Sequence, residues 1–133
     1  MNPASLSSES GAPGTPRVFR PWGWYETLAL GDGYLVKRLR VRAGQRISRQ
    51  RHHHRCEQWV VVCGHGTIEC DGRLIEATVG ASVFIPVGGM HRASAGSHDL
   101  EIIEVQRGDV LSEDDIERFD DDYGRVVTSV NNL

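Results

Sequence analysis

Hydrophobic residues recur along the chain in short stretches of alternating apolar and polar positions. The stretches are rich in Val, Ile, Tyr and Trp, and Gly, Asp or Pro separates them, which is the pattern of short β-strands joined by tight turns. It predicts strands near residues 24–29, 33–42, 46–53, 57–63, 66–71, 73–76, 82–85, 90–94 and 99–106. Short strands at this regular spacing favour a β-sandwich or β-barrel.

The two ends of the chain differ from this β pattern. Residues 1–16 consist mainly of Ser, Gly, Pro and Ala without an apolar run, which predicts a disordered leader before a single domain over residues 17–133. Near the other end, Ser112 is followed by three acidic residues. This arrangement has the form of a helix capping box and predicts a short helix over about residues 112–119.

Composition narrows the class of protein further. With 133 residues, 39% of them hydrophobic and 25% charged, the chain can build one core. A net charge of −3 gives no sign of a nucleic-acid partner, and no apolar run reaches the length of a membrane helix. The three cysteines are an odd number without a preceding secretory signal, so we expect reduced thiols and a cytoplasmic location.

Several metal-ligating residue types occur inside the β pattern. In a strand, His52 and His54 would point to the same face, and Glu57 opens the next predicted strand. His91 follows a Gly- and Pro-rich turn that could return the chain across a barrel. Three neutral imidazoles and a carboxylate suit one divalent ion of Mn, Fe, Co, Ni or Zn.

The spacing of these residues resembles the two motifs of the cupin superfamily. The first motif would comprise Gly44, His52-x-His54, Glu57 and Gly64, and the second Gly80, Pro86-x-Gly88 and His91. The resemblance implies an all-β cupin, which is a double-stranded β-helix or jelly-roll barrel. It also implies a metal site made of the four ligands named above.

A closer resemblance is carried by four separated blocks in the same order. They are Arg20-Pro21-Trp22-Gly23, Gln50 to Gly64, Ile103 to Gly108, and Glu113 to Arg125. These blocks resemble the C-terminal domain of bifunctional mannose-1-phosphate guanylyltransferase/mannose-6-phosphate isomerases. The resemblance implies a type II phosphomannose isomerase, which interconverts mannose 6-phosphate and fructose 6-phosphate through an enediol. The sequence has no Gly-rich nucleotide loop of that family's other domain, so nucleotide transfer is not expected of it.

An isomerase of this kind needs a Lewis acid, a base and cations for the phosphate. Lys37 shares a strand face with Leu35, Leu39 and Val41, where an ammonium is costly unless it is paired or functional. We therefore expect it to bind substrate or move protons. By alternation Glu104 is the best candidate for the base, although it could equally be an outward-facing strand carboxylate.

Substrate-binding candidates flank these positions. Ser48 and Gln50 share the face of His52 and could hydrogen-bond sugar hydroxyls, and Arg55 directly follows the histidines. Arg118 and Arg125 lie in the block that resembles the isomerase signature, so the resemblance makes them candidates for phosphate binding. The alternative for these two arginines is pairing with the neighbouring acids of residues 113–122.

The leading hypothesis from the sequence is a metal-dependent sugar-phosphate isomerase with a small-molecule substrate. One alternative is a non-catalytic metal-binding cupin that binds a sugar as a sensor or accessory subunit. Another is a different cupin enzyme, such as an iron dioxygenase, because one fold serves many functions. We also expect a homodimer, with the apolar segment containing Trp22, Trp24 and Tyr25 covering a strand edge or joining a partner.

Overall fold

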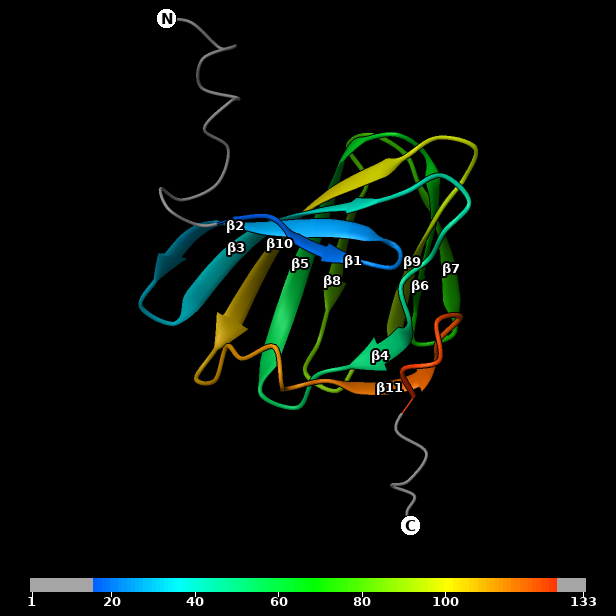
Figure 1. Cartoon of the computed structure of the whole chain (residues 1–133). Helices are drawn as coiled ribbons and strands as arrows, with labels where there is room; N and C mark the ends of the chain where they lie inside the picture. Colours follow the sequence, from blue (N-terminus) through cyan, green and yellow to red (C-terminus); the bar gives the residue numbers. More distant parts are fainter. Residues whose placement is uncertain (1–15, 127–133) are drawn as a thin grey trace, which may run out of the picture.

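Two antiparallel sheets face each other in the computed structural model, which describes residues 16–126 (Figure 1). The first sheet has the order β1-β2-β3-β10-β5-β8 and the second the order β11-β4-β9-β6-β7. In the first sheet the strands are β1 (Val18–Arg20), β2 (Gly23–Gly31), β3 (Tyr34–Val41), β10 (Leu100–Gly108), β5 (Arg55–Cys63) and β8 (Ser82–Ile85). In the second they are β11 (Glu117–Asp120), β4 (Arg49–Arg51), β9 (His91–Ala95), β6 (Gly66–Cys70) and β7 (Arg73–Ala77).

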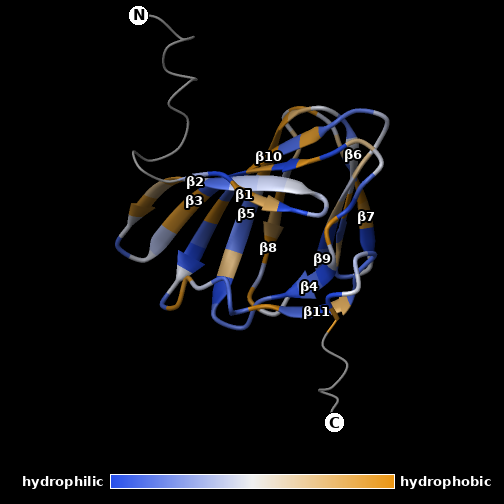
Figure 2. Cartoon of the chain, viewed as in Figure 1, coloured by the Kyte–Doolittle hydropathy of each residue, from blue (hydrophilic) through white to orange (hydrophobic). Residues whose placement is uncertain are grey.

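The core lies between the two sheets, and hydrophobic alternation places it there. Hydrophobic and hydrophilic residues alternate along the strands (Figure 2), so that every second side chain points inward. The buried cluster draws from both sheets and consists of Trp22, Tyr25, Leu39, Val41, Ile47, Trp59, Val61, Ile68, Cys70, Ala77, Val83, Ile85, Ala93, Leu100 and Ile102. At the same inward positions near one end of the barrel, charged and polar side chains replace the apolar ones.

The predicted strands are found with small shifts, and the all-β class is confirmed. The predicted strand over 46–53 is mostly irregular: only Arg49–Arg51 forms β4, and a single bridge joins Arg46 to Ser94. Strand β1 was not predicted, because it has three residues and pairs with β2 through a very short turn. Such a strand is too short for alternation to reveal.

The helix expected over 112–119 is wrong. A single turn does form at its start, where the N–H of Asp114 donates to Ser112 Oγ at 3.0 Å and the N–H of Asp115 to the Ser112 carbonyl at 3.1 Å. The chain then leaves as β11 and pairs with β4, with Arg118 opposite Gln50. Tertiary pairing therefore overrides the local capping signal.

Asp115 fastens this C-terminal segment to the barrel. Its carboxylate accepts the backbone N–H groups of His53 and His54, both at 2.9 Å, and its carbonyl oxygen lies 2.7 Å from Nδ1 of His52. Burial alone would raise the pKa of the Asp115 carboxyl, but the two N–H donors and the charges of His54 and Arg55 outweigh it and lower that pKa. The carboxylate form is therefore part of the folded structure.

Replacing Asp115 with Asn is expected to lower the free energy of unfolding at pH 7 by about 1–3 kcal/mol. The new NH2 group would face the backbone N–H of His53 or His54, and two donors cannot hydrogen-bond to each other. The pKa of Asp115 is lower in the folded protein than in the unfolded chain, where it is about 3.9. Ionised Asp115 therefore stabilises the folded protein fully above that pH, and the stabilisation is lost as the pH falls through the pKa of the folded state. Urea unfolding at pH 7 and pH 3 should therefore show a difference from wild type that shrinks on acidification. Exposed Asp114→Asn is the control, and an equal loss in both variants would contradict this role.

The expected partner surface and the expected N-terminal leader are not confirmed by the described residues. Of the segment predicted to cover an edge or join a partner, Trp22 and Tyr25 are buried in the chain's own core, whereas Trp24 is partly exposed. The homodimer stays a prediction. The leader expected over residues 1–16 falls almost wholly outside the described residues, as do residues 127–133. Within residues 16–126 no helix has the length and apolar character needed to cross a membrane.

Candidate metal and substrate site

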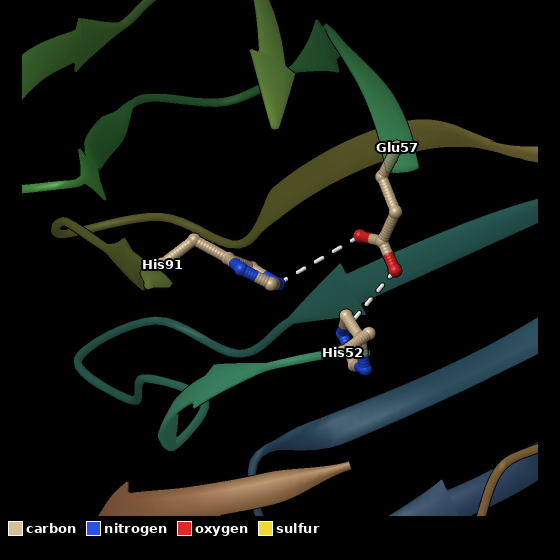
Figure 3. Close-up of side chains that lie close together, drawn as sticks. All are labelled: His52, Glu57 and His91. Carbon is tan, nitrogen blue, oxygen red and sulfur yellow. Dashed lines mark ion pairs between the residues drawn. The ribbon is translucent and has the colours of Figure 1, made fainter. Parts of the chain in front are cut away.

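Three potential metal ligands converge inside the barrel from three different segments. His52 follows β4, Glu57 projects from β5 and His91 begins β9 (Figure 3). Nε2 of His52 lies 3.2 Å from one carboxylate oxygen of Glu57, and Nε2 of His91 lies 3.7 Å from the other. One ligand atom from each residue lies within 4.8 Å of the others, and all three side chains are buried.

The backbone fixes both imidazoles in the form that binds a metal. Nδ1 of His52 lies 2.7 Å from the Asp115 carbonyl and Nδ1 of His91 lies 2.8 Å from the Gly89 carbonyl. A carbonyl can only accept, so each Nδ1 carries the proton and each Nε2 presents a lone pair. Burial, followed by the charges of Arg55 and His91, lowers the pKa of His52 to about 3, which keeps this ring neutral.

These residues fit a divalent cation. Nε2 of His91 lies 3.7 Å from a Glu57 oxygen and is buried without a hydrogen-bond partner among the described residues. A buried acceptor in that position is costly unless a cation or donor occupies the space. Arg55 donates to Glu57 at 2.8 Å and orients the carboxylate, and its guanidinium also lies 3.4 Å from Nε2 of His52.

The structure does not bring His54 to this group, which corrects the four-ligand prediction. His54 is exposed, and no atom of it belongs to the cluster of His52, Glu57 and His91. The prediction assumed that strand alternation continues through residue 54, but β4 ends at Arg51 and residues 53–54 form a bend. The i and i+2 rule applies only within a strand, so His52 turns inward and His54 turns outward.

A pocket lies beside the metal-ligand group and brings together most of the other predicted site residues. Side chains of five segments line it: Arg20, Trp22, Tyr25, Lys37, Leu39, Ile47, Gln50, His52, Arg55, Glu104, Glu113, Ile116, Arg118 and Arg125. Of the predicted substrate-binding residues only Ser48 is not in its wall. Ser48 is fully buried and donates to Gln50 Oε1 at 2.8 Å, so it orients the Gln50 amide without lining the pocket itself.

Gln50 and His52 extend from the same face of the chain, two residues apart, and Gln50 lies directly opposite His91 in the β4–β9 ladder. The Gln50 side chain lines the same pocket as His52. Strand alternation predicted this placement correctly, because residue 50 lies within β4.

Lys37 and Glu104 occupy opposite positions in the β3–β10 ladder and both point inward. Lys37 forms an ion pair with Glu113 and lies 4.1 Å above the Tyr25 ring. Burial lowers the pKa of Lys37, although the charge of Glu104 opposes this shift. The outward-facing alternative for Glu104 is wrong, since its side chain is buried in the pocket wall.

A hydrogen-bond network joins Glu104 to the metal-ligand group. The indole N–H of Trp59 lies 3.0 Å from Oε1 of Glu57 and 3.0 Å from Oε1 of Glu104, and the Gln106 amide donates to Oε2 of Glu104 at 2.5 Å. Burial, and then the charge of Glu57, raises the pKa of Glu104. A carboxylate with a raised pKa is a stronger base than an exposed one.

Arg118 and Arg125, the two candidates for phosphate binding, both line the pocket, but their environments differ. Arg125 is held by two hydrogen bonds to Asp121, at 2.9 and 3.0 Å, so the alternative of pairing with a neighbouring acid describes it correctly. Arg20, from the end of β1, joins them in the pocket wall. Arg20 was not predicted as a site residue, although it begins the Arg20-Pro21-Trp22-Gly23 block.

Two antiparallel sheets that enclose a His/Glu/His group and an internal polar pocket define a cupin-type β-barrel. Solved cupins confirm this class: an RmlC-like cupin from Shewanella frigidimarina has a TM-score of 0.67 and 20% identity, covering 79% of this chain and 92% of that one. A cupin-2 domain from Rhodospirillum rubrum gives a TM-score of 0.65 and 17% identity over 78% and 80% of the two chains.

The chain belongs to the family described as "Mannose-6-phosphate isomerase C-terminal", whose model matches residues 10–121. It is 48% identical over 109 residues to the alginate biosynthesis protein AlgA of Pseudomonas aeruginosa, covering 81% of this chain and 23% of that protein. It is 46% identical over 110 residues to a mannose-1-phosphate guanylyltransferase of Escherichia coli, covering 82% of this chain and 23% of that protein. The chain thus spans about a quarter of the length of these relatives.

Proposed function

We propose that the chain is a metal-dependent sugar-phosphate isomerase that interconverts mannose 6-phosphate and fructose 6-phosphate. One observation carries the proposal: a single pocket places a base candidate, an ammonium and several guanidinium groups beside His52 of the metal-ligand group. Membership of the mannose-6-phosphate isomerase C-terminal family supports the choice of substrate.

The reaction moves a proton between C2 of the aldose and C1 of the ketose. His52, Glu57 and His91 would hold one divalent ion, which would supply Lewis-acid polarisation of the substrate oxygens. Glu104 is the proposed base, because the Trp59 indole and the Gln106 amide fix its carboxylate and burial raises its pKa. It takes the proton from one carbon and returns it to the other.

Lys37 has a supporting role in this proposal. It faces Glu104 across the β3–β10 ladder, so its ammonium can donate to a hydroxyl or carbonyl oxygen of the sugar while Glu104 handles the carbon-bound proton. Glu113, its ion-pair partner, is half-exposed and can move aside for a bound sugar. Gln50, held by Ser48, is positioned to hydrogen-bond a sugar hydroxyl.

A coupled assay tests the proposal. Chelator-treated protein is mixed in turn with Mn²⁺, Fe²⁺, Co²⁺, Ni²⁺ or Zn²⁺, and fructose 6-phosphate formed from mannose 6-phosphate is detected through phosphoglucose isomerase and glucose-6-phosphate dehydrogenase. We expect turnover that returns with at least one metal. Binding of the sugar phosphate without turnover for any metal would leave a non-catalytic cupin, and metal-dependent O₂ uptake would indicate an oxygenase.

A further inference from the structure

Two arginines in the pocket have no carboxylate partner within residues 16–126. Nε of Arg118 is buried and makes no hydrogen bond there. Arg20 donates to the carbonyl of its neighbour Phe19 at 3.1 Å and lies 5.5 Å from the Tyr25 ring. The other pocket cations are paired: Lys37 with Glu113, Arg55 with Glu57 in the metal-ligand group, and Arg125 with Asp121. Arg20 and Arg118 are therefore the pocket cations that form no ion pair with a carboxylate in the described structure.

Arg20 and Arg118 line the same pocket although nearly a hundred residues separate them in sequence. Burial lowers the pKa of Arg118, and the charge of Arg125 lowers it further. The charge of Asp121 opposes this shift, and the charge of Arg20 adds to it. Arg20 also contributes to lowering the pKa of Lys37. Like charges gathered in one partly buried pocket are unfavourable unless an anion binds between them.

Strand pairing and close packing constrain the backbone around Arg20. Arg20 pairs with Gly23 in the β1–β2 hairpin, and the following Pro21 restricts its backbone to extended conformations. Trp22 is anchored in the core. A Cβ on Gly23 would approach the carbonyl oxygen of Arg40 to 1.8 Å, so only glycine allows this turn to pack against β3. The Arg20 side chain therefore extends from a constrained backbone, which favours a binding role because little order has to be gained on binding.

We propose that Arg20 and Arg118 form a subsite for the phosphoryl dianion of the substrate, with Arg125 placed beside them by Asp121. Guanidinium groups bind phosphate oxygens in bidentate fashion and stay charged at any physiological pH. This subsite rests on the proposed function for the identity of the sugar but not for the recognition of the phosphate. It changes the assignment made from the sequence, because Arg20 replaces Arg125 as the partner of Arg118.

Isothermal titration calorimetry tests the subsite with inorganic phosphate, mannose 6-phosphate and unphosphorylated mannose as ligands. We expect Arg20→Gln and Arg118→Gln each to weaken binding of mannose 6-phosphate and phosphate at least tenfold, while any mannose binding is unchanged. Arg107→Gln is the matched control, since Arg107 is an exposed arginine of β10. Should Arg20→Gln fail to fold, Arg20→Lys keeps the charge but loses the bidentate fork, and weaker phosphate binding is expected from it too.

Failure of the subsite can be told apart from failure of the isomerase. If the variants bind both phosphate compounds as tightly as wild type, the subsite is wrong even where the wild type turns over mannose 6-phosphate. Absence of phosphate binding by the wild type would also overturn it. If phosphate binding depends on both arginines but no metal gives turnover, the subsite stands and the isomerase proposal falls.

Discussion

Replacing His91 with Ala should abolish stoichiometric binding of a divalent ion and, with it, the proposed isomerase activity. His91 supplies a lone pair on Nε2 whose direction is set by the bond from Nδ1 to the Gly89 carbonyl. Two ligands remain in the variant, too few for the coordination that transition metals favour. Because Lewis-acid polarisation is worth several kcal/mol, we expect kcat to fall on the order of 10²- to 10⁴-fold.

Metal content after dialysis and the shift in melting temperature on adding metal measure this effect directly, without an activity assay. An ion present at a hundred times its Kd stabilises the folded state by about 2.7 kcal/mol, and this stabilisation should disappear in the variant. His54→Ala is the matched control, because His54 is an exposed imidazole two residues from a ligand. If His54→Ala loses the metal as His91→Ala does, the three-ligand geometry is wrong.

Strand alternation predicted most of the barrel because each buried strand carries the signal in its own residues. In β5, for example, Glu57, Trp59 and Val61 point inward and the residues between them outward. The signal failed where tertiary partners decide the conformation. Ser112 caps a turn as its sequence indicates, but the bonds of Asp115 to the histidine segment and the pairing of β11 with β4 prevent a helix.

The same distinction between local and tertiary signals applies to the residues of the candidate site. Alternation put Lys37 on the inner face of its strand and left Glu104 open between an inner and an outer position. The structure places both inside, opposite each other in the β3–β10 ladder. His54 was misplaced because the strand it was assigned to ends at Arg51. Arg20 was missed because its role depends on Arg118, which reaches the same pocket from a distant segment. No local pattern within a single sequence reveals such proximity.

Replacing Glu104 with Gln should lower kcat on the order of 10²- to 10⁴-fold, the usual contribution of a positioned base, while metal content stays that of the wild type. Gln is nearly isosteric and retains a carbonyl oxygen to accept the hydrogen bond from Trp59. Its amide N–H can donate to Oε1 of Gln106 once the Gln106 amide flips, because that oxygen has no hydrogen-bond partner among the described residues. The buried environment that raises the pKa of Glu104 also tolerates a neutral amide. The variant should therefore fold and bind sugar phosphate, but it cannot take a proton from carbon.

Hydrogen exchange at carbon separates this role from a merely structural one. In D₂O the wild type should place deuterium at C2 of mannose 6-phosphate, whereas Glu104→Gln should show neither exchange nor turnover at unchanged affinity for the sugar phosphate. Lys37→Met is the comparison, since Lys37 faces Glu104 but acts on oxygen in the proposed reaction, and some exchange should persist in it. Normal exchange in Glu104→Gln together with none in Lys37→Met would transfer the role of base to the lysine.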